Sequence, residues 1–340
     1  MRQVWITRVG PPEVLQLRED RDPEPGPGQL RIQVQACGIN FADIMARIGV
    51  YPDAPPMPCV VGYEVAGIID KLDDPSSGFK VGDKVVALCR FGGYSDVVCV
   101  SPRQVFAIPD NMTFPEAVAL PVNGVTAYQT MVVMGALKAR ERILIHGAAG
   151  GVGLAAIDIA RIVGAEIYGT ASAAKHPFLR DRGVHHCIDY RTQDFESEVM
   201  RLTNGEGVHL VIDPIGGESW TKSMAVLAPT GRLACIGFSG AAQSKGRNVM
   251  AALTNFVKVP WLQFSPIALM NANKAVIGVN LGHLWKQQDL VAGWMRQIMA
   301  WAREGKIRPH VGQTFPLAEA AAAHHYIQDR KNTGKVVLVP

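Results

Sequence analysis

The sequence has few of the features that mark a secreted protein, a protein with a structural metal site or a nucleic-acid-binding protein. Its six cysteines are scattered and include no Cys-x-x-Cys pair, so we expect neither a disulfide framework nor a four-cysteine zinc lobe. Basic residues outnumber acidic ones by only 34 to 30 and are dispersed, which argues against a nucleic-acid face. No apolar run reaches the ~18 residues of a membrane span, and the first residues predict a strand rather than a signal peptide. These absences predict a soluble, cytoplasmic protein.

The composition is that of a compact enzyme. Hydrophobic residues make up 48% and charged residues 19% of the 340 positions, which is enough for two domains with a substantial core. The most apolar stretch, 257–270, is interrupted by lysine, glutamine and two prolines, so we expect a buried or interface segment there.

One segment predicts a nucleotide site. Residues 143–153 are Ile-Leu-Ile-His-Gly-Ala-Ala-Gly-Gly-Val-Gly, an apolar strand running into a glycine-rich turn that opens an apolar helix. Such a turn presents backbone N–H groups and a helix N-terminus to a diphosphate, and a second strand follows at the spacing of one βαβ unit. We assign Gly147 to leaving the strand, Gly150 and Gly151 to close approach of the phosphates, and Gly153 to packing of the helix on the strand. The alternative is a purely structural turn.

The two parts of the chain differ in their patterns. Up to residue 124 the sequence predicts a mainly β domain, with helices at 41–47 and 115–119 and strands at 4–7, 15–18, 30–36, 65–71, 84–88 and 94–100. From 125 to 304, strands and helices alternate, which favours a doubly wound parallel sheet with its ligand at the carboxyl ends of the strands. There we expect strands at 142–146, 166–170, 186–189, 209–213, 232–236 and 275–279, and helices at 126–134, 151–163, 175–182, 195–202, 218–226, 249–257 and 290–304. A final strand at 334–339 is predicted to rejoin the first domain.

The residues after the second strand of the nucleotide unit favour NADPH over NADH. Folds selective for the non-phosphorylated cofactor place an Asp or Glu about 20 residues past the turn. Here segment 169–176 is Gly-Thr-Ala-Ser-Ala-Ala-Lys-His and contains no acid. Ser172 and Lys175 offer a hydroxyl and an ammonium to a ribose phosphate, and the alternative for Lys175 is an ordinary solvated lysine. Tyr190 either packs against the same phosphate or covers the edge of the sheet.

Several motifs point to one family. They are Gly-Ile-Asn-Phe-Ala-Asp at 38–43, Gly-Tyr-Glu-Val-Ala-Gly at 62–67, Gly-Gly-Tyr at 92–94, Thr-Ala-Tyr at 126–128, Ala-Gly-Gly-Val-Gly at 149–153 and Lys-Asn-Thr-Gly-Lys-Val at 331–336. Over essentially its whole length the chain resembles the zinc-independent quinone oxidoreductase branch of the medium-chain dehydrogenase/reductase superfamily. Segments 169–176, 188–191, 213–217 and 247–252 look most like the vesicle amine transport protein homologues.

The resemblance implies an architecture. We expect an α/β protein with a GroES-like, mainly β domain over 1–124 and 305–340, and a Rossmann domain with a doubly wound parallel sheet that binds NADPH over 125–304. It also implies a homodimer that pairs through the edge strand near 275–279.

By the same resemblance, two metal ligands are missing. Zinc-containing members hold their catalytic metal with a cysteine and a histidine at positions that here are Asn40 and Tyr63. An amide and a phenol are poor zinc ligands, so we predict no metal. The adjacent histidines at 185–186 and 324–325 do not change this, because neighbouring side chains point in different directions. Without a Lewis acid, hydride transfer works best on an acceptor that is already electrophilic, such as a quinone, an α,β-unsaturated carbonyl compound or an enoyl thioester.

The resemblance also assigns roles to single residues. Asn40 is placed beside the nicotinamide, where its amide donates to the substrate carbonyl, unless it is an ordinary turn asparagine. Tyr51 borders the cleft as a proton donor or a packing residue, and Tyr63 fills the space of the lost ligand. Asp43 and Glu64 are expected to be structural. The expected cofactor-binding residues are Thr126, Ala149, Gly150, Gly151, Val152, Ser172, Lys175, Tyr190, Gly237, Phe238, Ser239, Val279, Asn280, Asn332 and Lys335.

We therefore expect an NADPH-dependent reductase of quinones or activated alkenes, acting on a small-molecule acceptor. A second hypothesis is an enoyl reductase that acts on thioesters. A third is a nucleotide-binding scaffold, associated with vesicles, lipid or RNA, with little catalysis.

Overall fold

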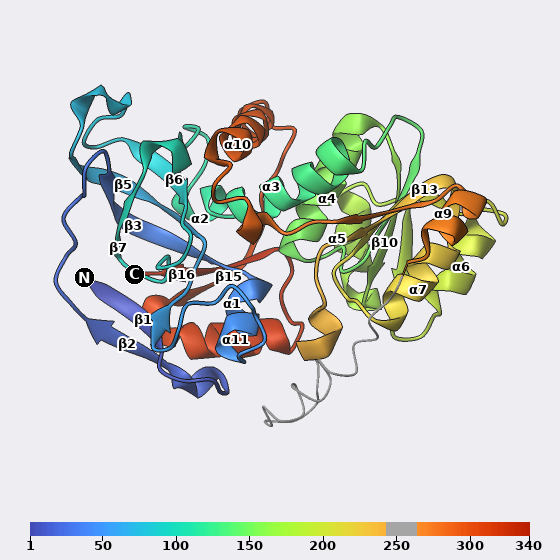
Figure 1. The fold of residues 1–340 in the computed structure, drawn as a ribbon, viewed down its shortest axis with the longest axis horizontal. Helices are drawn as coiled ribbons and strands as arrows, with labels where there is room; N and C mark the ends of the chain where they lie inside the picture. Colours follow the sequence, from blue (N-terminus) through green and yellow to red (C-terminus); the bar gives the residue numbers. More distant parts are fainter. Residues whose placement is uncertain (243–263) are drawn as a thin grey trace. The chain divides into compact units, whose positions relative to one another are not determined.

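The computed structural model of the chain describes residues 1–242 and 264–340, and these form two compact units (Figure 1). Unit 1 consists of Met1–Val125 and Leu281–Pro340, and unit 2 of Thr126–Asn280. The boundary falls after residue 280 rather than after 304, because helix α10 (Gln288–Arg303) packs on strand β8 (Val105–Ala107) of unit 1. The helix expected at 249–257 and the motif at 247–252 lie outside the described residues.

Unit 1 is built on a sheet with the strand order β15-β16-β3-β5-β6-β8, in which β7 also pairs with β3. Alternate residues of β3, such as Leu30, Ile32 and Val34, are buried in its core, as the period of a half-buried strand requires. The other strands of this sheet are β5 (Glu64–Leu72), β6 (Lys84–Leu88), β7 (Val97–Val100), β15 (Val311–Pro316) and β16 (Lys335–Val339), and β3 itself is Leu30–Ile39.

The last strand completes the sheet begun by the first third of the chain. β16 lies between β15 and β3 and is antiparallel to β3, with Val337 opposite Gly38. Helix α11 (Ala320–Gln328), which the sequence did not predict, connects β15 to β16, and β15 was not predicted either. The remaining helices of unit 1 are α1 (Phe41–Arg47), α2 (Phe114–Ala117) and the first part of α3 (Pro121–Tyr128).

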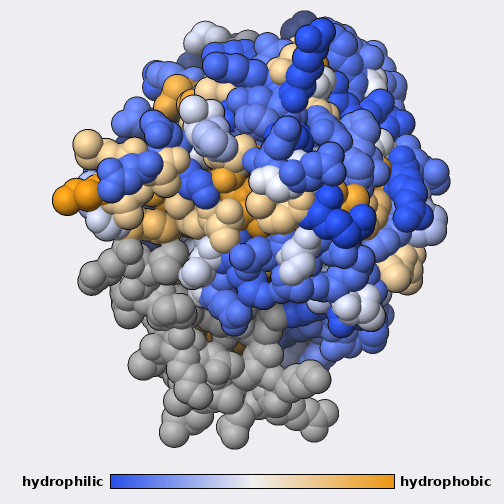
Figure 2. Space-filling view, turned by 90° about the vertical axis from the view of Figure 1, so that its right-hand side faces the viewer, coloured by the Kyte–Doolittle hydropathy of each residue, from blue (hydrophilic) through white to orange (hydrophobic). Residues whose placement is uncertain are grey.

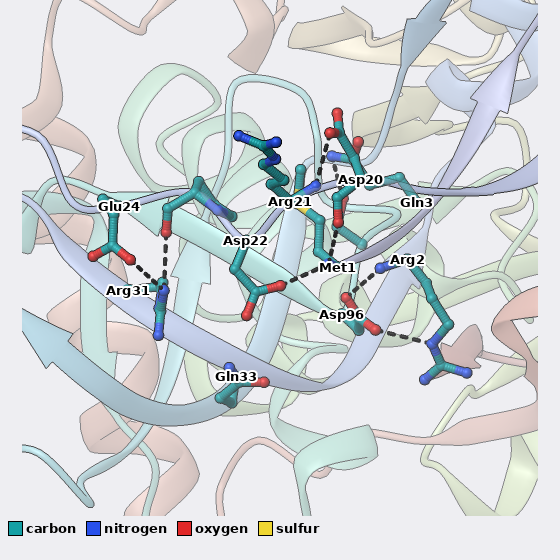
Figure 3. Close-up of polar contacts among 12 residues, drawn as sticks. Met1, Arg2, Gln3, Asp20, Arg21, Asp22, Glu24, Arg31, Gln33 and Asp96 are labelled. Atoms are coloured by element: carbon teal, nitrogen blue, oxygen red, sulfur yellow. Dashed lines mark hydrogen bonds and ion pairs between the residues drawn. The ribbon is translucent and has the colours of Figure 1, made fainter.

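A small second sheet in unit 1 holds β1 (Arg2–Ile6) between β2 (Leu15–Glu19) and β4 (Cys59–Val60). Its first residue is tied to the main sheet, because Arg2 donates from Nε to Asp96 Oδ2 at 2.9 Å and from its backbone N to Asp96 Oδ1 at 2.7 Å (Figure 3). Nearby, the buried guanidinium of Arg31 donates to the carbonyl of Pro23 at 3.1 Å (Figure 3). These contacts anchor the N-terminal strands to β3 and to the segment before β7.

Unit 2 contains the doubly wound parallel sheet that the sequence predicted. Its strands run parallel in the order β11-β10-β9-β12-β13-β14, so the first strand, β9, lies in the middle and the order reverses between β9 and β12. Their bounds are β9 (Arg142–Ile145), β10 (Glu166–Ala171), β11 (His186–Asp189), β12 (Val208–Asp213), β13 (Leu227–Cys235) and β14 (Ala275–Gly278).

Helices cover this sheet, and α6 and α7 pack side by side (Figure 1). The described helices of unit 2 are α4 (Gly151–Val163), α5 (His176–Asp181), α6 (Phe195–Leu202), α7 (Glu218–Ala225) and α9 (Pro266–Ala272). The single α-helix expected at 126–134 is wrong. From Gln129 to Met134 the chain forms a π-helix, in which Gly135 N bonds the carbonyl of Thr130 at 2.8 Å, five residues back.

One segment corrects the expectation about apolar runs. Phe114–Met134 is 21 residues long and apolar enough to cross a membrane by length and composition. Of its most apolar window, 67% is buried inside the structure. It therefore has the character of a core helix.

Candidate active site

The glycine-rich turn follows β9, next to the point where the strand order reverses. Gly147 has φ +62, a conformation that side chains rarely adopt, so its predicted role in leaving the strand is confirmed. The turn is closed by a hydrogen bond from Gly150 N to Gly147 O at 2.8 Å, and the 13-residue helix α4 starts at Gly151. The first N–H groups of an α-helix have no acceptor within it, so those of Gly151 and Val152 are offered to a ligand.

The glycines of this turn differ in what surrounds them. A Cβ on Gly150 would meet only Gly147 O, at 3.2 Å, which leaves the rest of its surroundings open to a ligand. A Cβ on Gly153 would lie 2.6 Å from the carbonyl oxygens of both Gly147 and Ala148. There is therefore no room for a side chain at Gly153, where α4 lies closely on the turn, and the same helix also packs on β9 and β10.

The segment after β10 brings together the residues predicted to bind a ribose phosphate. Ser172 is buried and precedes a short 3-10 turn, in which Lys175 N donates to Ser172 O at 2.9 Å. Burial lowers the pKa of Lys175, the hydroxyl of Tyr190 raises it, and the charge of Arg191 lowers it. The charge of Arg191 thus acts on Lys175. We did not select it from the sequence, although it ends the motif at 188–191.

The ends of β13 and β14 complete the same carboxyl edge of the sheet. The loop after β13 carries Gly237, Phe238 and Ser239, and Ser239 N bonds the carbonyl of Pro214 at 2.8 Å. After β14, Val279 is buried and its N–H bonds Cys235 O at 3.0 Å, with Asn280 next in sequence. In a doubly wound sheet this edge is where ligands bind, and most of the predicted cofactor residues lie on it. Thr126 does not, because it lies in α3.

In unit 1, Asn40 stands in a buried ionic cluster. Its Nδ2 donates to Glu64 Oε1 at 2.9 Å, and its Oδ1 accepts from Lys335 Nζ at 2.7 Å. Lys335 and Glu64 form a direct ion pair, and the other Glu64 oxygen accepts from Val122 N at 2.7 Å. Lys335 is 2% exposed and Glu64 is fully buried, so the Lys335 ammonium is committed to this cluster. Asn332, also expected at a cofactor, donates within its own turn to Gly334 O at 3.4 Å.

A second buried cluster holds the backbone on both sides of the candidate substrate residues. Asp43 accepts from Asn40 N at 2.7 Å and from Gly62 N, just before Tyr63, at 3.1 Å. The Tyr94 hydroxyl donates to Asp43 at 3.1 Å and lies 3.0 Å from His324 Nε2. Burial raises the pKa of Asp43 to about 7. Asp43 is therefore structural, as expected, and it fixes the positions of Asn40 and Tyr63 together.

Tyr63 provides a buried hydroxyl. Its ring lies 5.3 Å from that of Phe91 and 6.3 Å from that of Tyr51, measured between centroids. Tyr63 is 6% exposed, and its hydroxyl makes no hydrogen bond of normal geometry with the described parts of the chain. Burial raises the pKa of both Tyr51 and Tyr63, so both phenols stay protonated at neutral pH. The three rings form an aromatic wall in which the hydroxyls of Tyr51 and Tyr63 influence each other.

Within residues 1–242 and 264–340, no three His, Cys, Asp or Glu side chains form a group that could hold a metal ion. Asn40 and Tyr63, which the family resemblance sets at the positions of the two missing zinc ligands, make the contacts described in the preceding paragraphs. Of the adjacent histidines, His324 belongs to the buried cluster, while His185 accepts from Ile167 N at 2.9 Å and His186 pairs with Glu166 at 2.8 Å.

Two protein families match the chain. Residues 26–110 match the family described as alcohol dehydrogenase GroES-like domain, and residues 182–338 match the family described as zinc-binding dehydrogenase. Together with the parallel sheet of unit 2, these matches confirm the predicted combination of a GroES-like and a Rossmann domain.

Curated relatives cover almost the whole chain. It is 41% identical over 329 residues to the human synaptic vesicle membrane protein VAT-1 homolog, which covers 96% of this chain and 82% of that protein. It is 32% identical over 357 residues to a quinone oxidoreductase of Pseudomonas aeruginosa, covering 100% of this chain and 99% of the relative.

Solved structures agree with these relatives. The Escherichia coli quinone oxidoreductase complexed with NADPH superposes with a TM-score of 0.87 at 28% identity, and the alignment covers 100% of both chains. The CurK enoyl reductase superposes with a TM-score of 0.85 at 30% identity, covering 99% of this chain and 98% of that one.

Proposed function

Because the chain belongs to the medium-chain dehydrogenase/reductase superfamily, in the group of quinone oxidoreductases and VAT-1 homologs, we propose that it is an NADPH-dependent reductase of quinones or α,β-unsaturated carbonyl compounds. Its fold and its relatives are those of a quinone oxidoreductase-like enzyme. The proposal goes beyond the family in three points: a preference for NADPH, the class of acceptor, and independence from zinc.

The observation that carries it is the carboxyl edge of unit 2. The glycine-rich turn and the start of α4 offer backbone N–H groups to a diphosphate, with open space beside Gly150. Ser172, Lys175 and Arg191 would give a 2′-phosphate donors and positive charge, and segment 169–176 contains no acid to compete. These residues fit NADPH, which supplies the hydride when bound.

Tyr63 and Asn40 supply the groups that orient an acceptor. The Tyr63 hydroxyl is a buried donor without a partner of normal geometry in the described chain, so hydrogen bonding to an acceptor oxygen satisfies it. Asn40 uses one amide hydrogen on Glu64, which leaves the second hydrogen of Nδ2 for the same purpose. Flat rings at Tyr51, Tyr63 and Phe91 suit a planar, conjugated acceptor.

The test follows oxidation of NADPH and NADH, by loss of reduced-nicotinamide absorbance, against a quinone, an enone and an enoyl thioester. We expect turnover with quinone or enone, higher kcat/KM with NADPH than with NADH, and no change when a chelator is added. Absence of NADPH binding in calorimetry, or stoichiometric zinc in active protein, would contradict the proposal.

A matched pair of variants tests the acceptor site. Tyr63→Phe keeps the ring and removes the hydroxyl, so kcat/KM for the acceptor should fall about tenfold, the equivalent of one hydrogen bond, while NADPH affinity stays the same. Tyr326→Phe removes a hydroxyl elsewhere in unit 1, from a ring packed on Phe315, and should change neither value. Equal kinetics for the Tyr63 variant and wild type would remove Tyr63 from the site.

Two other functions are separated by the same assay. An enoyl-thioester reductase is favoured by the likeness to the CurK enoyl reductase and would turn over the thioester fastest. A nucleotide-binding scaffold is favoured by the likeness to the human synaptic vesicle membrane protein VAT-1 homolog and would bind NADPH without turning over any acceptor.

We also propose a homodimer that forms through the edge strand β14, and a cytoplasmic location. Within the described residues β14 pairs with β13 alone, which leaves its other edge available to a second copy. On the face shown in Figure 2, hydrophobic residues gather in a band, and Ile267 and Met270 of the adjacent helix α9 are 69% and 75% exposed.

A further inference from the structure

Four buried polar side chains form a continuous chain of hydrogen bonds in unit 2. Thr170 Oγ1 lies 3.1 Å from His146 Nδ1, and His146 Nε2 lies 3.2 Å from Ser223 Oγ. Ser223 donates to Asp213 Oδ2 at 2.8 Å. All four residues are at most 3% exposed and come from β10, the end of β9, α7 and β12. None of them belongs to the cofactor residues assigned above.

The direction of each bond follows from the proton count. Ser223 has one hydroxyl hydrogen and gives it to Asp213, so it accepts from His146 Nε2–H. Burial lowers the pKa of His146 and keeps the imidazole neutral, so Nδ1 accepts from the Thr170 hydroxyl. Thr170 Oγ1 in turn accepts from the backbone N–H of Gly147 at 3.3 Å. Every donor in the chain therefore has one acceptor, and one tautomer of His146 satisfies all of them.

The two ends of the chain reach two separate parts of the proposed cofactor site. At one end, Gly147 is the first residue of the glycine-rich turn. At the other end, Asp213 Oδ1 accepts from Ile215 N at 2.7 Å and from Gly216 N at 3.2 Å, and so shapes the loop after β12.

That loop in turn holds the segment that carries Gly237, Phe238 and Ser239. Ser239 N bonds Pro214 O at 2.8 Å, and Gly240 N bonds Ile215 O at 2.9 Å. The backbone is close here as well, because a Cβ on Gly216 would lie 3.1 Å from Phe238 Cα. The rings of Phe195 and His146 pack nearly at right angles, with 4.5 Å between their centroids.

We propose that His146 is a positioning residue that couples the glycine-rich turn after β9 to the loop after β12, so that NADPH meets both as one preorganised surface. The inference rests on the proposed function for its ligand, but the coupling itself is a property of the cofactor-free protein. Thr170, Ser223 and Asp213 are the links through which the imidazole acts.

The first experiment measures binding of cofactor and fragment by calorimetry. His146→Phe keeps an aromatic ring against Phe195 and removes both nitrogens, and it should weaken NADPH binding about tenfold. Binding of 2′-AMP, which needs only the Ser172 and Lys175 region, should not change. Equal NADPH affinity in wild type and variant would overturn the proposal, and so would an equal loss for both ligands.

A double-mutant cycle tests transmission along the chain. Thr170→Val and Ser223→Ala each break the hydrogen-bond chain, on different sides of His146. The double variant should therefore bind NADPH as tightly as whichever single variant binds it less tightly. If the fold-losses of NADPH affinity in the two single variants multiply in the double variant, the two effects are independent and the coupling is overturned.

Thr203→Val is the matched control. Thr203 is also buried in unit 2, and its hydroxyl accepts from Gly207 N at 2.9 Å much as Thr170 accepts from Gly147 N. The control should lower stability and leave NADPH affinity unchanged.

Amide hydrogen exchange of the cofactor-free protein separates this inference from the proposed function. His146→Phe should speed exchange in both 146–150 and 214–217, whereas Thr203→Val should speed it in neither. Faster exchange in one segment alone, or in neither, would overturn the coupling. A wild-type protein that fails to bind NADPH would instead overturn the proposed function, while the exchange experiment would still decide the coupling.

Discussion

Lys335 donates a hydrogen bond from Nζ to Oδ1 of Asn40 at 2.7 Å, although 295 positions separate the two residues in sequence. Because Oδ1 is occupied, the NH₂ group of Asn40 turns toward Glu64, where it makes a 2.9 Å bond. The orientation of a candidate substrate-binding amide is thus fixed from the last strand of the chain. Lys335 thus has a structural part in the site, and its expected contact with a cofactor stays a prediction.

The first prediction concerns this ion pair. Lys335→Met removes the cation and leaves the Glu64 carboxylate buried without it, so the free energy of unfolding should fall by about 3–5 kcal/mol. Adding Glu64→Gln in the same chain should restore much of the loss, because the buried charge is then gone. Urea unfolding measures both, and Lys331→Met is the surface control. A Lys335→Met protein as stable as wild type would contradict the buried pair.

The second prediction is a pH dependence of stability carried by His324. Burial and the nearby charge of Arg47 hold the pKa of His324 well below its usual value of 6.5, and Arg47 Nε donates to its Nδ1 at 3.3 Å. Below pH 6.5 the unfolded chain takes up a proton that the folded chain does not. The contribution of His324 to stability should therefore fall with falling pH, by up to about 1.4 kcal/mol per pH unit. Asp43, whose pKa burial raises to about 7, contributes with the opposite sign in the same range.

His324→Gln should remove this contribution, measured as the pH dependence of the difference in unfolding free energy between variant and wild type from about pH 4 to 7, the range in which an unfolded histidine takes up its proton. His325→Gln, which alters the exposed neighbour, should keep it. If the His324 variant retained the wild-type slope, acid sensitivity would have to come from other groups.

The third prediction concerns cofactor choice. Lys175→Glu places a carboxylate where a 2′-phosphate is proposed to bind, so the preference for NADPH should be lost, with kcat/KM for NADPH falling roughly 10–100-fold. NADH kinetics should change little. Lys306→Gln, a surface change in unit 1, serves as the control. Selectivity that survives Lys175→Glu would show the phosphate pocket to be elsewhere.

The fourth prediction compares two glycines in helices. Gly153→Ala puts a methyl 2.6 Å from two carbonyl oxygens, and it should destabilise the protein by about 1–3 kcal/mol and weaken NADPH binding. Gly293→Ala in α10 meets nothing nearer than 3.9 Å, and it should stabilise by about 0.5–1 kcal/mol through higher helix propensity. Thermal unfolding measures both, and the same sign for the two would contradict the packing described.

The fifth prediction tests the proposed dimer. Ile267→Glu with Met270→Glu introduces charge on the exposed face of α9, and light scattering should then report a monomer. Val81→Glu, at a residue of unit 1 that is 62% exposed, should leave the wild-type mass unchanged. A wild-type protein that is monomeric at micromolar concentration would end the hypothesis.

The sequence predicted the elements whose patterns are local. Helices α4 and α6 and strands β6 and β11 have the predicted bounds, because each is an apolar pattern of clear period between turn residues. Strand β15 was missed, since no residue of Val311–Pro316 is buried and the segment contains glycine and proline. The π-helix was missed because Thr130 donates from its hydroxyl to Thr126 O at 2.7 Å, a local bond with no hydrophobic pattern.

The candidate site shows the same division. Ser172, Lys175 and the glycine-rich turn lie in contiguous motifs and could be proposed from the sequence. The link of Glu64 to Lys335 and the chain from Thr170 to Asp213 join residues that are distant in sequence, and no period or spacing encodes such pairs. Only the strand order brings them together.

The position of β16 inside the sheet of unit 1 has a consequence for synthesis on the ribosome. A nascent chain that ends near residue 310 has exposed one edge of β3 and holds Glu64 without its counterion. Unit 2 is continuous in sequence and can fold during translation, whereas unit 1 is completed only after its last strand emerges. A chain cut before Lys335 would therefore lack both the β16 pairing of β3 and the partner of Glu64.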